Sequence, residues 1–174
     1  HGLFAALGLI VVGFAAGYSL NPAFSAAMLA YFVLTLAYSL KLKRIPMLDV
    51  SAIGALFTLR IVMGTVLNGL MLSPMLLSFS AAFFFSLALA KRHVEVMSAH
   101  ANGKASVVGR GYDAADWPLT LGFGITSAMI SLVVMLLFIT EFASRGAYSS
   151  PQWLYVAPVC VSLWVQRIWL LAHR

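Results

Sequence analysis

Two clusters of basic side chains stand where long apolar stretches of the sequence end: YSLKLKRIPMLD at 38–49 and AKRHVE at 90–95. In the first cluster, Tyr38, Lys41 and Lys43 fall within about one and a half helical turns of one another. Lysine ammonium groups bind phosphate oxygens as point charges, and hydroxyl groups add hydrogen bonds. The alternative is that these basic residues, like those at many cytoplasmic helix ends, only determine the membrane topology. Beside apolar helices, such clusters fit an anionic headgroup that is attached to an apolar chain.

Arg60 is a single cation about halfway along an apolar stretch. An isolated guanidinium at that depth costs several kcal/mol, so it is tolerated only beside a polar cavity or a partner. Asp49 precedes it by eleven positions, and at about 100° per residue this returns to nearly the same helical face. The spacing therefore predicts one face with a carboxylate near the membrane surface and a cation about 16 Å deeper. The alternative to a chemical role is a buried hydrogen bond that joins two helices.

The basic cluster at 90–95 follows the apolar run FFFSLALA without a spacer. Glu95 lies four positions after Lys91 and three after Arg92, so a solvated face of ion pairs is one interpretation. Direct attachment to the apolar run favours a second interpretation, in which the two cations point at the mouth of a cavity between helices.

A further basic segment, GRGYDAADW at 109–117, precedes another apolar stretch. Asp113 or Asp116 is expected to cap the helix that follows. Arg110 and Tyr112 stand next to glycines, and a flexible loop of this kind is suited to cover a bound phosphate. The sequence of this segment is compatible with both roles, helix capping and phosphate binding.

The acidic and histidine residues do not predict a metal site within the chain. His93 and His100 lack helical metal-ligand spacing relative to each other or to Glu95. No Asp-rich run of the DDxxD or NDxxD type is present, and neither a phosphate-binding Walker loop nor a GxSxG motif occurs.

The composition indicates that lipid is the solvent of this chain. Of 174 residues, 62% are hydrophobic and only 9% are charged. The apolar runs are continuous, which favours helices over the alternating strands of a membrane barrel. Each run is close to the ~20 residues that a helix needs to cross a bilayer. The expected fold is all-α, a polytopic transmembrane helix bundle forming one domain over 1–174. The predicted spans are 3–19, 22–39, 50–70, 74–90, 117–140 and 152–172.

The basic residues lie almost entirely at one set of predicted helix ends, and by the positive-inside rule these ends face the cytoplasm. The opposite ends carry Arg145. The net charge of +6 therefore belongs to one face of a membrane protein, and no nucleic-acid partner is expected. The basic residues on the cytoplasmic side are Lys41, Lys43, Arg44, Lys91, Arg92, Lys104, Arg110, Arg167 and Arg174.

The segments that carry these charges resemble the UbiA superfamily of intramembrane prenyltransferases. They are most similar to its polyprenyl-phosphate (decaprenyl-phosphate) phosphoribosyltransferase branch. The matching segments are YSLKLKRIPMLDVSAIGALFTLRIVMG (38–64), LALAKRHVE (87–95) with GRGY (109–112), and RIWLLAHR (167–174). The resemblance implies a bundle of nine helices in a bacterial plasma membrane, of which this chain supplies the third to the eighth. We therefore expect a piece of a longer protein, without the family's first Asp-rich motif and its last helix.

The resemblance also implies a reaction. The family's second motif, DxxxD, is replaced here by Lys91, Arg92 and Glu95. Cations in place of carboxylates favour transfer of 5-phosphoribosyl from phosphoribosyl diphosphate to a polyprenyl phosphate, for cell-envelope precursor synthesis. Mg²⁺ is the implied cofactor, with its main ligands outside this chain. Catalytic roles are predicted for Arg60, Lys91 and Asp49. Phosphate binding is predicted for Tyr38, Lys41, Lys43, Arg44, Arg92, Glu95, Arg110 and Tyr112.

Three other functions are compatible with the sequence. An aromatic-acceptor prenyltransferase that uses a polyprenyl diphosphate, in a quinone or heme pathway, is expected to have an Asp pair at positions 91–95. A transporter of phosphorylated metabolites is expected to have broken helices and inverted repeats, whereas the predicted spans are unbroken. A non-catalytic lipid-binding scaffold is the third alternative.

Overall fold

The computed structural model describes residues 2–144 and 150–174, and within these residues the six predicted spans correspond in order to six α-helices. Five helical segments there are long and apolar enough to cross a membrane, the exception being the first helix, whose apolar part is the shorter Gly8–Leu20. Arg145 lies outside the described residues. The α-helices are α1 (Gly2–Leu20), α2 (Pro22–Leu40), α3 (Leu48–Leu67), α4 (Pro74–Ala101), α5 (Trp117–Ser144) and α6 (Val156–His173). Short 3-10 helices are η1 (Leu42–Arg44), η2 (Ala114–Asp116) and η3 (Pro151–Tyr155).

The helix starts have sequence-encoded caps. The Asn21 side chain accepts hydrogen bonds from the backbone N–H groups at the start of α2, and Pro22 occupies the first turn. At the start of α4, the Ser73 side chain accepts a hydrogen bond from the backbone N–H of Leu76, and Pro74 occupies the first turn. Asp113 and Asp116 form a reciprocal capping box at η2, directly before α5, which confirms the expected capping role.

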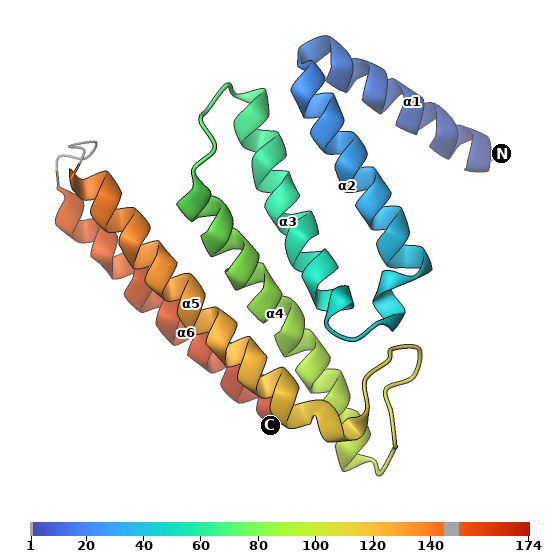
Figure 1. Cartoon of the computed structure of the whole chain (residues 1–174), viewed down its shortest axis with the longest axis vertical. Helices are drawn as coiled ribbons and strands as arrows, with labels where there is room; N and C mark the ends of the chain where they lie inside the picture. Colours follow the sequence, from blue (N-terminus) through green and yellow to red (C-terminus); the bar gives the residue numbers. More distant parts are fainter. Residues whose placement is uncertain (1, 145–149) are drawn as a thin grey trace.

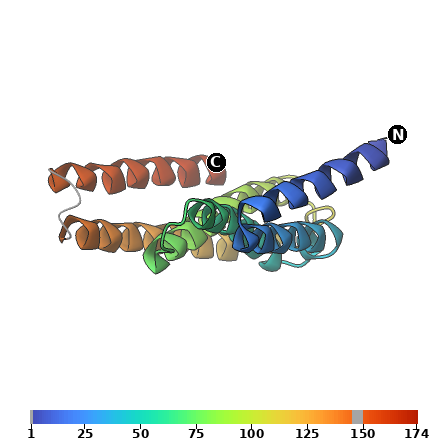
Figure 2. The ribbon, with the colours of Figure 1, turned by 90° about the horizontal axis from the view of Figure 1, so that it is seen from above.

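Helices α2, α3, α4 and α5 lie side by side in one layer (Figure 1). Helix α6 packs on α4 and α5, and α1 packs on α2; both lie on the same side of the layer (Figure 2). Consecutive helices run in opposite directions. One end of the bundle therefore gathers the ends of α2, α4 and α6 with the starts of α3 and α5 (Figure 1). We call it the charged end, because the basic clusters lie there.

The apolar core lies where α3, α4, α5 and α6 meet. Its buried members include Val50, Leu89, Ala128, Val165 and Trp169. Helix α2 has no buried residue at all. Apolar side chains that stay exposed on a helix of this length are expected when the surroundings are lipid.

Close packing of α5 against α6 depends on Gly124. Its carbonyl accepts a hydrogen bond from Ser86 Oγ (2.8 Å), which in turn accepts one from Trp169 Nε1 (3.1 Å). A Cβ at Gly124 would overlap the Trp169 ring. We expect Gly124→Ala to destabilise the bundle by about 1–3 kcal/mol through overpacking, measured by unfolding in SDS. Gly122→Ala is the matched control, because a Cβ there meets nothing within 4 Å. Equal stability of the two variants would contradict this packing.

Candidate functional site

A buried ionic cluster lies at the charged end, centred on Asp49. The Asp49 side chain has no exposed surface. Arg92 Nε lies 2.8 Å from its Oδ2 atom, and the Tyr112 hydroxyl donates a hydrogen bond of 2.7 Å to its Oδ1 atom. The Arg92 Nε–H is not aligned for a hydrogen bond to Oδ2, so this contact is an ion pair only. Helices α3 and α4 and the segment before α5 are thus joined through one carboxylate.

Two more charged residues extend the cluster toward the surface. Arg92 also pairs with Glu95, three positions later on α4. Arg110 lies 3.9 Å from both Asp49 Oδ2 and Glu95 Oε2, and its Nη1 donates to the Tyr38 hydroxyl of α2 at 3.3 Å. The Asp49 cluster, defined as Asp49, Arg92, Glu95, Arg110 and Tyr112, therefore contains two positive and two negative side chains. A pair of buried charges is tolerated when each is matched in this way.

The surroundings shift the pKa values of both loop members of the cluster. Burial and the hydrogen bond to Asp49 raise the pKa of Tyr112 well above its ordinary value, so it remains a neutral donor. Burial acts to lower the pKa of Arg110, but the Tyr38 hydrogen bond and the two carboxylates outweigh it and the pKa is raised. Arg110 is therefore a permanent cation.

A short hairpin places Arg110 and Tyr112. Val107 N donates to Tyr112 O, and Ala114 N donates to Ala105 O, each at 2.9 Å. Gly109 turns the chain with a positive φ of 74°. We call residues 104–113 the hairpin loop.

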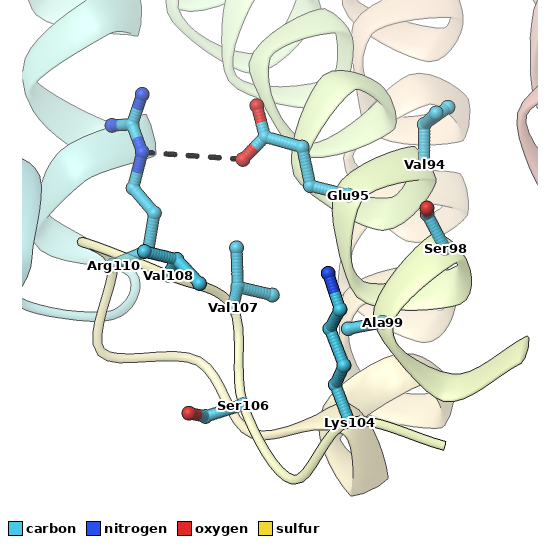
Figure 3. A pocket seen from close by; sticks show the side chains of 9 residues that line it. All are labelled: Val94, Glu95, Ser98, Ala99, Lys104, Ser106, Val107, Val108 and Arg110. Carbon is cyan, nitrogen blue, oxygen red and sulfur yellow. Dashed lines mark ion pairs between the residues drawn. The ribbon is translucent and has the colours of Figure 1, made fainter. Parts of the chain in front are cut away.

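An open pocket of about 540 Å³ lies between the end of α4 and the hairpin loop. Figure 3 shows Glu95 reaching toward Arg110 across it, while Lys104 extends from the start of the loop alongside α4. We call this space the charged-end pocket. It is lined by Val94, Glu95, Ser98, Ala99, Lys104, Ser106, Val107, Val108 and Arg110.

Sequence reasoning did not identify three polar residues of this pocket, Ser98, Lys104 and Ser106. From the sequence, Lys104 is only one of the basic residues that predict which side of the membrane faces the cytoplasm. It has no helical spacing relative to Glu95 that would predict a contact. Its place in the pocket follows from the fold of the hairpin loop, for which the sequence offers only the glycines as a signal.

The structure does not bring Arg60 into the Asp49 cluster. Its Nη2 and Nε atoms donate to the Tyr31 hydroxyl of α2 at 2.6 and 3.2 Å, and its guanidinium lies over the Phe57 ring, 4.9 Å from the centroid. This contact matches the alternative of a hydrogen bond between two helices. Asp49 and Arg60 share α3, but Asp49 contacts α4 and Arg60 contacts α2. The catalytic role of Arg60 stays a prediction.

The other predicted cations lie around the cluster without joining it. Lys41, Arg44 and Lys91 are exposed and Lys43 is half-buried, and none of them lines the charged-end pocket. Their roles in catalysis and phosphate binding stay predictions.

The described residues do not form a metal site on their own. In the ranges 2–144 and 150–174, no three His, Cys, Asp or Glu side chains are placed to hold one ion. His93 is instead buried, with Nδ1 2.9 Å from Thr120 Oγ1 and Nε2 3.1 Å from His173 Nδ1. These side chains therefore do not fit a resident Mg²⁺.

The fold and the ionic end define an intramembrane helical protein with a polar site at one end of the bundle. The sequence model of the UbiA prenyltransferase family matches residues 1–174, and the chain belongs to this family.

Two longer proteins are similar to the chain. It is 56% identical over 175 residues to y4nM of Sinorhizobium fredii, an uncharacterized protein, and covers 34% of that protein. It is 28% identical over 174 residues to the nodulation protein NoeC of Azorhizobium caulinodans, and covers 56% of it. The chain thus spans about a third and just over half of these relatives. No solved structure matches.

Proposed function

We propose that the full-length protein transfers 5-phosphoribosyl from phosphoribosyl diphosphate to a polyprenyl phosphate, with the charged-end pocket as the donor site. The observation that supports this most is the meeting of Arg110, Lys104 and Glu95 in one pocket. Its size lies within the range of about 300–1,000 Å³ that is usual for small-molecule sites. The chemistry of these three side chains matches the two kinds of group on this donor.

Phosphoribosyl diphosphate carries phosphates and ribose hydroxyls. Arg110 and Lys104 are suited to the phosphates, because a guanidinium and an ammonium make charge-assisted hydrogen bonds to phosphate oxygens. Glu95 is suited to the hydroxyls, since an ionised carboxylate only accepts hydrogen bonds. A prenyl diphosphate has no hydroxyl for Glu95 to accept from, and its diphosphate would meet a like charge there.

The transfer replaces one bond at the anomeric carbon of the ribose. An oxygen of the polyprenyl phosphate forms a bond to that carbon, and the bond to diphosphate breaks with its electron pair leaving on the diphosphate. Arg110 and Lys104 stabilise the negative charge that develops on the leaving group. We also propose Mg²⁺ as a cofactor, whose main ligands would be residues outside this chain.

We also propose that the charged-end pocket faces the cytoplasm. The basic residues gather at the charged end, and by the positive-inside rule this supports a pocket on the cytoplasmic side of a bacterial plasma membrane. A water-soluble phosphoribosyl donor and the phosphate of an inner-leaflet lipid then meet at the same surface.

The test is an assay of the full-length protein in membranes with radiolabelled phosphoribosyl diphosphate and polyprenyl phosphate. We expect a labelled, lipid-extractable product that depends on both substrates. A parallel reaction contains a polyprenyl diphosphate and an aromatic acceptor. A product from this second pair alone, or from neither pair, would contradict phosphoribosyl transfer.

A further inference from the structure

We propose that Asp49 is a positioning residue: it docks the hairpin loop onto the connection between α2 and α3, and thereby sets the place of Arg110 in the charged-end pocket. The docking itself does not depend on which substrate the pocket binds. Its effect on turnover rests on the proposed function.

Burial separates Asp49 from any substrate. The side chain is fully buried, Oδ1 accepts from Tyr112, and Oδ2 faces Arg92. Arg92 and Tyr112 are themselves only 1% and 2% exposed. A carboxylate enclosed in this way cannot touch a ligand in the pocket, so its influence must pass through the groups that it holds.

Tyr112 connects the loop to two places at once. Its hydroxyl donates to Asp49 Oδ1 at the start of α3, and it accepts a 2.8 Å hydrogen bond from the backbone N–H of Met47. Met47 has a positive φ of 64°, which is uncommon for a residue with a side chain. A single phenol therefore fixes the hairpin loop against both α3 and an unusual backbone turn.

Gly111 makes this docking sterically selective. A Cβ at this position would lie 2.6 Å from the carbonyl oxygen of Arg44 and 2.7 Å from Cδ of Pro46. The obstacle is backbone and a rigid ring, so it has little freedom to move aside. The loop therefore reaches the α2–α3 connection only because position 111 has no side chain.

Arg110 precedes these two docking residues directly. Its guanidinium lies 3.9 Å from both Asp49 and Glu95, and it donates to Tyr38. The Arg110 backbone N–H also donates to Val107 O within the loop, at 3.2 Å. If the hairpin loop separates from the α2–α3 connection, Arg110 moves away from the charged-end pocket that it lines.

The test measures a distance in the full-length protein. Spin labels are placed at Val108→Cys on the loop and Leu40→Cys at the end of α2, which are 88% and 75% exposed. Cys160 is exposed and is first replaced by Ser. Pulsed electron paramagnetic resonance in nanodiscs is expected to give one narrow distance distribution. We expect Asp49→Asn, Tyr112→Phe and Gly111→Ala each to broaden it.

Gly64→Ala is the matched control, because a Cβ there meets nothing within 4 Å and the distribution is expected to stay narrow. Tyr112→Phe removes one hydroxyl and keeps the ring, so we expect this variant to stay folded and to report on the hydrogen bond itself. A narrow distribution in Asp49→Asn or in Tyr112→Phe would overturn the proposal.

Turnover gives a second readout. In Tyr112→Phe, we expect the KM for phosphoribosyl diphosphate to rise about tenfold, as for the loss of one hydrogen bond to a charged group, with a smaller change in kcat. A purely structural role would lower the amount of folded protein and leave KM unchanged. Broadened distances without transferase activity in any variant, wild type included, would support the docking and reject the proposed function.

Discussion

Arg110→Gln should lower the rate of phosphoribosyl transfer by about 10²–10³-fold, the usual effect of removing one donor that stabilises developing charge. Arg110 is held by Tyr38 and by two carboxylates, so its position is fixed before any substrate enters. Glutamine keeps a hydrogen-bond donor but loses the positive charge that would face the leaving diphosphate. The measurement is the initial rate of lipid-linked product formation by full-length protein in membranes.

Arg167→Gln is the matched control for this prediction. It removes the same charge from the charged end, but Arg167 is an exposed residue of α6 that does not line the pocket. We expect its rate to stay within a few-fold of wild type. Similar losses in both variants would mean that the overall positive charge of this end matters and that the pocket geometry does not.

The positions of the helices were predictable because lipid exposure makes them continuous apolar runs. The ends were less predictable. Helix α4 continues to Ala101, well past the predicted end of its span at 90, because Lys91, Arg92 and Glu95 stay in the helix. Hydropathy detects where the apolar run stops, whereas backbone hydrogen bonding carries the helix on into the polar region.

The candidate site was predictable in part. Asp49, Arg92, Glu95, Arg110 and Tyr112 were all singled out from the sequence, and the structure brings them together.

The arrangement of the site could not be derived from the sequence. Helical spacing predicts which residues lie on one face of a helix, but it does not predict which other helix packs against that face. Asp49 and Arg60 were expected along one face of α3. In the structure, the first contacts α4 and the second contacts Tyr31 of α2. Lys104 enters the site through the conformation of a loop, which hydrophobic periodicity does not describe.

Arg92→Met should destabilise the protein by about 3–5 kcal/mol, the usual cost of removing one partner of a buried ion pair. Arg92 and Asp49 are almost completely buried, and their closest atoms are 2.8 Å apart. Methionine fills much of the space of the arginine stem. The loss of stability therefore comes from the buried Asp49 carboxylate, which no longer has its closest partner, and not from a cavity. Arg110, at 3.9 Å from Asp49 Oδ2, offers only partial compensation. Unfolding in SDS, followed by circular dichroism, measures the change.

The double variant Asp49→Leu with Arg92→Met separates the lost ion pair from poor packing. Replacing both members of a buried pair by apolar residues is often nearly neutral, because no charge is left without a partner. We expect the double variant to recover most of the stability that Arg92→Met loses, although Tyr112 no longer has its acceptor on Asp49. A double variant as unstable as the sum of the two single variants would show that the two side chains act independently. In that case, the buried carboxylate would not be what makes Arg92 necessary.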